Sequence, residues 1–229
     1  MIFLVNIFLT QMGLHCSKSK VIDEDSIELD AISCCIEYSE DVKLVFPSGV
    51  KKLTFRHFTS SENQVIKIPE SVTELYLDIT YDLKFVILPK SLEKLTLGNW
   101  FNGSIKDVEF PKTLNTLIFG KRFNQDVKNL KLPKNLVYLE FGDDFDQDIR
   151  NANFPSSLLT LIIPGKFNHD VRNANFPKSL HHLSLGYWFD QDVRNANFPK
   201  SLIYLDLGRR FSQSTSNANF PKDLTVRYF

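Results

Sequence analysis

The fold is decided by a stretch that reads Leu88-Pro89-Lys90-Ser91-Leu92-Glu93-Lys94-Leu95-Thr96-Leu97-Gly98-Asn99-Trp100-Phe101-Asn102, because the chain repeats it. Seven of the eight intervals between the equivalent prolines are 22 residues long, and the interval from Pro69 to Pro89 is 20 residues. A fixed period of this length is typical of a solenoid, in which one unit is stacked repeatedly. The prolines are Pro47, Pro69, Pro89, Pro111, Pro133, Pro155, Pro177, Pro199 and Pro221.

Each unit is predicted to contain one short β-strand. Leu95 and Leu97 flank Thr96, and this alternation sends the two leucines to one face of a strand and the threonine to the other. The leucines are therefore expected in the core, with a further leucine, Leu92, where the chain turns into the strand. The equivalent inward pairs are Leu117 and Phe119, Leu139 and Phe141, Leu161 and Ile163, Leu183 and Leu185, and Leu205 and Leu207.

The fold class that follows is mainly β: a parallel β-solenoid of 22-residue units, similar to a leucine-rich repeat, with mostly irregular return segments. A unit of this length has no room for a strand and a long helix, and its proline and glycine interrupt it further. Phenylalanines from Phe101 to Phe211 recur at the unit spacing and are expected to stack. The short polar residues that follow them, such as Asn102 and Asn124, are expected to bond their own backbone in tight turns.

Residues 42–229 are predicted to form one solenoid domain, and residues 1–41 an N-terminal cap or irregular segment. The apolar run at residues 2–9 has the length of a signal-peptide core, but no lysine or arginine precedes it and no small-residue cleavage pattern follows it. A secretory signal and a remnant of a helical adaptor module remain the alternatives to a cap. Cys16, Cys34 and Cys35 have neither a disulfide framework nor zinc-ligand spacing, which favours a cytoplasmic protein.

Composition excludes several function classes. Lysine plus arginine equals aspartate plus glutamate at 27 each, so the chain lacks the positive charge that draws proteins to nucleic acid. The run at residues 2–9 is too short to span a bilayer as a helix, so no membrane partner is expected. With 43% hydrophobic and 24% charged residues, the chain can bury a core.

No motif for catalysis, a metal or a cofactor is present. Asp144, Asp146 and Asp148 alternate as in a calcium loop, but Ile149 stands where that loop needs glycine and Pro155 where it needs glutamate. His181 and His182 are neighbours on a strand, so their side chains point to opposite faces and cannot share one ion. We therefore predict a protein that is not an enzyme, with no catalytic, cofactor or metal site.

The stretch from Leu88 to Asn102 and its echo from Phe123 to Val127 resemble the FNIP repeat family, a leucine-rich-repeat-like group of amoebal and large-DNA-virus proteins. The resemblance covers about residues 42–220. Pro164 departs from it at a glycine position and His169 at a glutamine position, and Arg227 stands at a leucine position of the last unit. The resemblance implies a non-enzymatic scaffold for protein–protein interaction, and some relatives join such repeats to an F-box that recruits a ubiquitin ligase.

Partner recognition is expected at positions that point outward and differ between units. One set lies on the outward side of the strands and the other just after the glycine of each unit. Amphipathic aromatic and arginine side chains at such positions are typical anchors of protein interfaces. The candidates are Lys94, Thr96, Trp100, Tyr138, Glu140, His182, Ser184, Tyr187, Trp188, Tyr204, Asp206, Arg209 and Arg210.

Three functions are compatible with this pattern. The leading hypothesis is a scaffold that binds a protein along its strand face. A narrower form of this hypothesis makes the chain the recognition part of a ubiquitin-ligase adaptor. The alternative is a structural protein that self-associates end to end, since the last strand, near residues 224–228, has no obvious cap. A glycan or small-ligand binder is the third, and the scatter of the outward aromatic residues along the sequence disfavours it.

Overall fold

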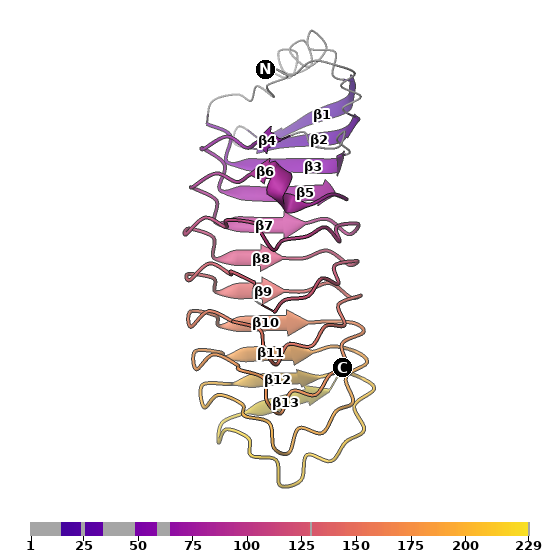
Figure 1. The fold of residues 1–229 in the computed structure, drawn as a ribbon, viewed down its shortest axis with the longest axis vertical. Coiled ribbons are helices and arrows are strands. Elements are labelled where there is room, and N and C mark those ends of the chain that lie inside the picture. Colours follow the sequence, from indigo (N-terminus) through magenta and orange to yellow (C-terminus); the bar gives the residue numbers. More distant parts are fainter. Residues whose placement is uncertain (1–14, 24–25, 34–48, 59–64, 129, 229) are drawn as a thin grey trace.

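The structure, a computed structural model, describes residues 15–23, 26–33, 49–58, 65–128 and 130–228. The chain forms a parallel β-solenoid of leucine-rich-repeat type, in which each coil contributes one strand to a single long sheet (Figure 1). The strands of this sheet are β1 (His15–Asp23), β2 (Ser26–Ser33), β3 (Lys52–Phe58), β5 (Glu74–Ile79), β7 (Lys94–Leu97), β8 (Thr116–Ile118), β9 (Tyr138–Glu140), β10 (Thr160–Ile163), β11 (His182–Leu185), β12 (Tyr204–Leu207) and β13 (Thr225–Tyr228).

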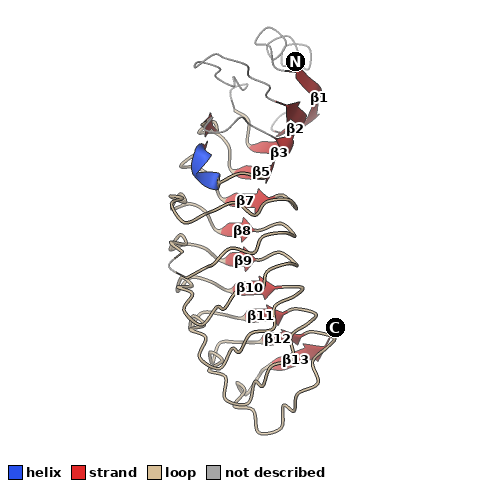
Figure 2. Cartoon of the chain, turned by 45° about the vertical axis from the view of Figure 1, so that its right-hand side comes forward, coloured by secondary structure: helices blue, strands red, loops and turns tan. Residues whose placement is uncertain are grey.

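The register between coils follows the 22-residue period. Leu139 in β9 pairs with Leu117 in β8 and with Leu161 in β10, and the same one-unit step continues to β12. The shorter unit from Pro69 to Pro89 is accommodated differently, by a single 3₁₀ turn, η1 (Leu83–Phe85). Next to it lies a small two-stranded sheet of β4 (Ile66–Lys67) and β6 (Val86–Ile87) on the return side. Figure 2 shows the 3₁₀ helix η1, in blue, on the loop side of the strand column.

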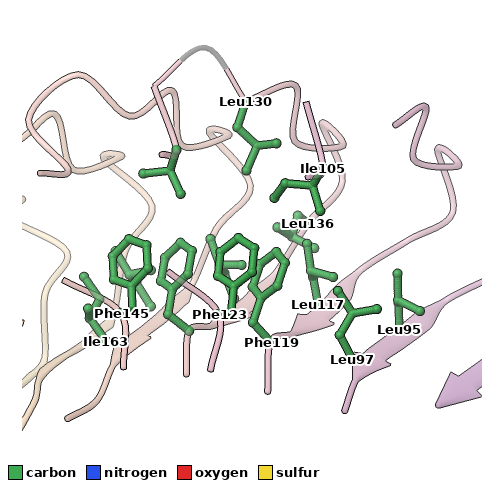
Figure 3. Packing of buried hydrophobic residues seen from close by; sticks show 14 of the residues in the cluster. Leu95, Leu97, Ile105, Leu117, Phe119, Phe123, Leu130, Leu136, Phe145 and Ile163 are labelled. Carbon is green, nitrogen blue, oxygen red and sulfur yellow. The ribbon is translucent and has the colours of Figure 1, made fainter. Parts of the chain in front are cut away.

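The core lies between the strands and the return segments (Figure 3). Leu117 in β8 and Phe119 directly after it belong to one cluster with return-segment residues such as Phe123 and Leu130. Successive phenylalanines stack as expected: the ring centroids of Phe123 and Phe145 are 6.3 Å apart. Because every inward side chain packs against its equivalents in the neighbouring coils, the solenoid has one continuous core along its length.

Tight contact between coils explains the glycine that follows most of the repeat strands. A Cβ atom on Gly142 would lie 1.9 Å from the carbonyl oxygen of Gly120 in the preceding coil. The turn that enters each strand is equally regular, since the Leu92 N–H donates to the Pro89 carbonyl at 3.2 Å and later units repeat this bond. The repeated proline, leucine and glycine are thus explained by the backbone path and the packing between coils.

The polar residues after the phenylalanines bond to the next coil, so the expectation that they bond their own backbone is wrong. The Asn102 side-chain oxygen accepts from the Asn124 backbone N–H at 2.9 Å, and the Asn124 oxygen accepts from Asp146 in the same way. The stacking places a backbone N–H of the next coil beside these oxygens, and the same bond joins Asn168 to Asp190 and Asp190 to Ser212. The side chains therefore link coils.

β13, the strand after Pro221, begins one residue earlier in register than the sequence pattern indicates. Val226 pairs with Leu205, and Arg227 pairs with Asp206 on the outward side. The assignment of Arg227 to an inward leucine position is therefore wrong. Thr225 N–H donates to the Ile203 carbonyl, as Ile203 N–H does to His181 one unit earlier, but Thr225 itself then pairs with Tyr204, so the strand begins one residue sooner. This places Val226 toward the core and leaves the arginine facing outward.

The N-terminal segment extends the sheet. β2 pairs parallel to β3, and β1 pairs antiparallel to β2, so these two strands continue the column beyond the repeats. Both strands lie within residues 1–41, and the capping role of that segment stays a prediction. The apolar run at residues 2–9 and the cysteines at 34 and 35 lie outside the described residues.

Candidate protein-binding surface

The outward residues of the strands form two columns across the sheet. Register places Lys94, Tyr138, His182 and Tyr204 in one column with two threonines. Thr96, Glu140, Ser184 and Asp206 lie in the other with two isoleucines, Ile118 and Ile162. The sequence therefore predicted correctly which strand residues share the outward face.

Two of these residues are joined by a strong hydrogen bond. Tyr138 Oη donates to Glu140 Oε2 at 2.5 Å. Partial burial and this bond to a carboxylate raise the pKa of Tyr138, because both disfavour the phenolate. The pair thus places a hydrogen-bonded phenol and carboxyl group in the middle of the sheet.

A second cluster lies near the C-terminal end of the face. His182 Nε2 lies 2.6 Å from Asp206 Oδ2, and Arg227 donates to both Asp206 oxygens. Asp206 is only 6% exposed as a result, so this candidate is covered by its partners and is not an open contact residue. Tyr204 remains 43% exposed beside the Arg227 guanidinium, 4.9 Å from its ring centroid.

Arg227 is the outward residue that the sequence pattern missed. The signal that could have found it is the alternation within β13 itself: Val226 and Tyr228 flank the arginine as Leu205 and Leu207 flank Asp206. The spacing from Pro221 points to another register, and spacing alone decided the sequence interpretation.

A rim of two-residue turns runs beside this face, just after each strand. The rim comprises residues 99–100, 121–122, 143–144, 165–166, 187–188 and 209–210. Trp100 and Trp188 are 50% and 49% exposed, and Tyr187 packs edge-on against Trp188 with centroids 5.5 Å apart. The candidates Arg209 and Arg210 are exposed in the last rim turn. The fold thus brings together Tyr187, Trp188 and Arg210, although the outward aromatic residues are scattered along the sequence.

Two hollows lie between the strand face and the rim. The larger, about 530 Å³, is lined by Ser184, Tyr187 and Asp206 among others. The smaller, about 260 Å³, extends over the earlier strands to Tyr76. Both include Asp143 and Pro164 in their walls, so the two hollows adjoin each other along the sheet.

The aspartates that resemble a calcium loop have other partners. Asp144 pairs with Lys166 at 2.7 Å, and Asp148 pairs with Arg150. Over the part of the chain that the structure describes, no group of three or more His, Cys, Asp or Glu side chains is placed to hold a metal ion. Within the same residues, no helix has the length and apolar character needed to cross a membrane.

Comparison with known proteins supports the repeat assignment at two levels. A solved structure described as that of CroV588, a novel circular LRR protein, is similar with 28% sequence identity and a TM-score of 0.57. The match covers 82% of this chain and 34% of that chain, so the present chain spans about a third of the circular protein. The comparison with curated proteins gives no match.

The family profile described as FNIP Repeat matches residues 63–99, 101–142, 123–166 and 167–210. These segments cover most of the described coils and contain the stacked phenylalanines and the asparagines that link one coil to the next. The chain therefore belongs to the FNIP repeat family.

Proposed function

We propose that this protein is a non-enzymatic scaffold that binds another protein along its strand face. The observation that carries the proposal is the contrast between the two sides of one sheet. Inward positions are leucine, isoleucine or phenylalanine from β7 to β12, whereas the outward positions change from unit to unit. Because the inward residues already account for stability, the outward variation is available for recognition.

The face offers the features of an interface. Tyr138 and Tyr204 present aromatic rings with polar tips, and the two hollows, lined by their strand neighbours Glu140 and Asp206, give a partner concave surface to enter. Tyrosine is enriched at interface anchors because it supplies large contact area together with a hydrogen-bonding group. Membership in a repeat family of leucine-rich-repeat type supports the same conclusion.

The test replaces Tyr138, His182 and Tyr204 together by alanine and compares proteins captured by the purified chain from its native cell. We expect the variant to lose the specific partner. The matched control replaces Asn151, Asn173 and Asn195, which are exposed on the return side, and it should keep the partner. If both variants captured the same amount of the partner protein, the strand face would not be the binding surface.

The adaptor role is a narrower form of the proposal, and the family resemblance motivates it. We place the protein in the cytoplasm, where its cysteines, which lack the spacing of a disulfide framework or a zinc site, would stay reduced. If the chain is the recognition part of a ubiquitin ligase, the captured set contains ligase subunits. A captured partner without them limits the protein to scaffolding.

Self-association is the second candidate, and the C-terminal end of the sheet favours it. β13 is the last strand in the sheet order, and Leu224 and Val226 are only half-buried there. A strand edge with apolar neighbours can pair with another chain. Sedimentation velocity over a range of protein concentrations tests it, and a monomer at every concentration would eliminate it.

A further inference from the structure

The rim has a backbone that is bonded from coil to coil. Arg122 N–H donates to the Asn99 carbonyl at 3.0 Å, and Asp144 N–H donates to the Lys121 carbonyl at 2.8 Å. Three further bonds of the same kind continue through the turns at residues 165–166, 187–188 and 209–210. The rim side chains are therefore held in register, one strand spacing apart, on a rigid edge.

The second residues of the rim turns form three successive pairs along this edge. Arg122 stacks on Trp100 with its guanidinium carbon 3.8 Å from the ring centroid, and Arg210 stacks on Trp188 at 4.8 Å. Between them, Lys166 pairs with Asp144. The middle pair neutralises itself, but stacking on an uncharged ring leaves each arginine with its full charge and its free N–H groups.

The first residues of the rim turns add to the same distribution of charge along the rim. Lys121 lies beside Arg122, and Arg209 lies beside Arg210, while Asp143 lies between these two sites. Within the described residues, none of Lys121, Asp143 and Arg209 takes part in an ion pair. The rim thus carries two cationic anchors, residues 121–122 and residues 209–210, separated by a neutral or negative middle.

The spacing of the anchors defines what can reach both. They are four units apart, which is about 19 Å at a strand spacing of about 4.8 Å, and an extended peptide rising about 3.3 Å per residue covers that distance in about six residues. Arginine held flat on an aromatic ring is suited to bidentate contact with a carboxylate. A nucleic acid is a poorer fit, since its phosphates are evenly spaced and would also meet Asp143, which lies between the anchors.

We propose that the rim binds an acidic segment of a partner protein, extended along the solenoid axis, with carboxylates at both anchors and uncharged residues over Asp143. This inference rests on the proposed function, because it names the kind of partner that the scaffold takes. It also assigns Trp100 and Trp188 a role: each holds the arginine of the next coil in position to receive a carboxylate.

The experiment uses the full chain and a fluorescein-labelled octapeptide that has two glutamates at each end and a serine–glycine linker between them. Fluorescence anisotropy should show binding that weakens as salt is raised. Arg122→Ala combined with Arg210→Ala should weaken it at least about fivefold. Lys178→Ala combined with Lys200→Ala makes the same change in net charge at exposed positions just before two strands and should leave it unchanged within about twofold.

Two further variants separate geometry from charge. Asp143→Asn should strengthen binding about twofold, because it removes an unpaired carboxylate that lies between the two anchors and repels an acidic peptide. Replacing both stacked arginines with lysine keeps the charge and should still weaken binding, because lysine cannot make the bidentate contact. Melting curves confirm that each variant is folded, as expected for exposed side chains.

Several results would overturn the inference. These are failure of the wild-type chain to bind the glutamate peptide, equal binding of a glutamine version, and an equal loss in the lysine control. Tighter binding of an oligothymidylate would assign the rim to nucleic acid instead. If the arginine variants keep the native partner while the strand-face variant loses it, the rim inference fails and the proposed function stands.

Discussion

The central coils and the last coil contain the same kinds of apolar side chain, yet they bury them to different extents. Phe145 is fully buried between Phe123 and Phe167. Phe211 stacks on Phe189 at 6.1 Å on one side and meets Tyr228 at a tilt on the other, and it stays partly exposed. A coil of this solenoid is therefore stabilised mainly by its neighbours, and the number of neighbours sets how much each residue contributes.

The largest test of this comparison is the pair Phe145→Ala and Phe211→Ala. Loss of the central phenylalanine should lower the free energy of unfolding by about 3 to 5 kcal/mol, since it removes a buried ring and leaves a cavity. Loss of Phe211 should cost about 1 to 2 kcal/mol, because part of its surface is already in water. Denaturant titration measures both, and equal losses would contradict the neighbour-based explanation.

The next test compares an inward and an outward residue of two repeat strands, β9 and β7. Leu139→Ala should cost about 2 to 5 kcal/mol, because Leu139 is 0% exposed and the change leaves a cavity. Thr96→Ala, on the outward side of β7, should cost less than about 0.5 kcal/mol. Similar values in the same titration would show that inward and outward columns are wrongly assigned.

A smaller effect is expected from the hydrogen bonds that link coils. Asn124→Ala removes the acceptor for the Asp146 N–H and for the Gln147 side chain, which should cost about 0.5 to 1.5 kcal/mol. In the last coil, Ser212→Ala should have less effect, because Ser212 bonds only to Asp190 in the coil before it. Thermal unfolding of the two variants ranks them, and the reverse order would be evidence against coil-to-coil linkage.

The smallest effect concerns acid. A side-chain hydrogen bond from Arg194 lowers the pKa of Asp192 to about 2 from its ordinary value of 3.8, and Arg150 does the same for Asp148. Because the folded-state pKa is the lower one, the stabilisation is present above about pH 4 and is lost as the pH falls toward 2. The last coil has Ser214 and Ser216 at the corresponding positions.

Asp192→Asn should therefore flatten the decline of the melting temperature between pH 4 and pH 2. Asp223→Asn, which changes an exposed carboxyl group in the last coil, is the control and should leave the slope unchanged. An unchanged slope in Asp192→Asn would show that the ion pair contributes nothing to folding. Each side chain of the pair is partly exposed, at 54% and 29%, so solvent screening keeps the effect small.

Most of the fold could be predicted from particular residues. The spacing of Leu95, Leu97 and their equivalents predicted the strand positions and the inward face, and the recurrence of Phe101 predicted the aromatic stack. The local register was harder to predict, as β13 shows: the same proline and leucine spacing placed Arg227 inward, whereas the strand begins one residue earlier. A one-residue slip exchanges the two faces of a strand, so spacing alone does not decide it.

The candidate surface was predicted in outline but not in its contacts. The sequence identified Trp100, Trp188 and Arg210 as variable outward residues, and its 22-residue period places each tryptophan one unit before an arginine, but the stacked geometry of these pairs is seen only in the structure. It likewise presented Asp206 as available, although His182 and Arg227 cover it. These contacts join residues that are distant in the chain, and only the stacking of coils brings them together.

The sequence by itself determined the solenoid, because a 22-residue period with alternating leucines can bury its apolar side chains only if each coil lies on the next. It also determined which residues face outward in the regular units. Tertiary structure alone decided which outward side chains pair, which are covered and where the charge of the rim remains free. The physical reason is that these properties depend on distances of a few ångströms between neighbouring coils, which register and packing set.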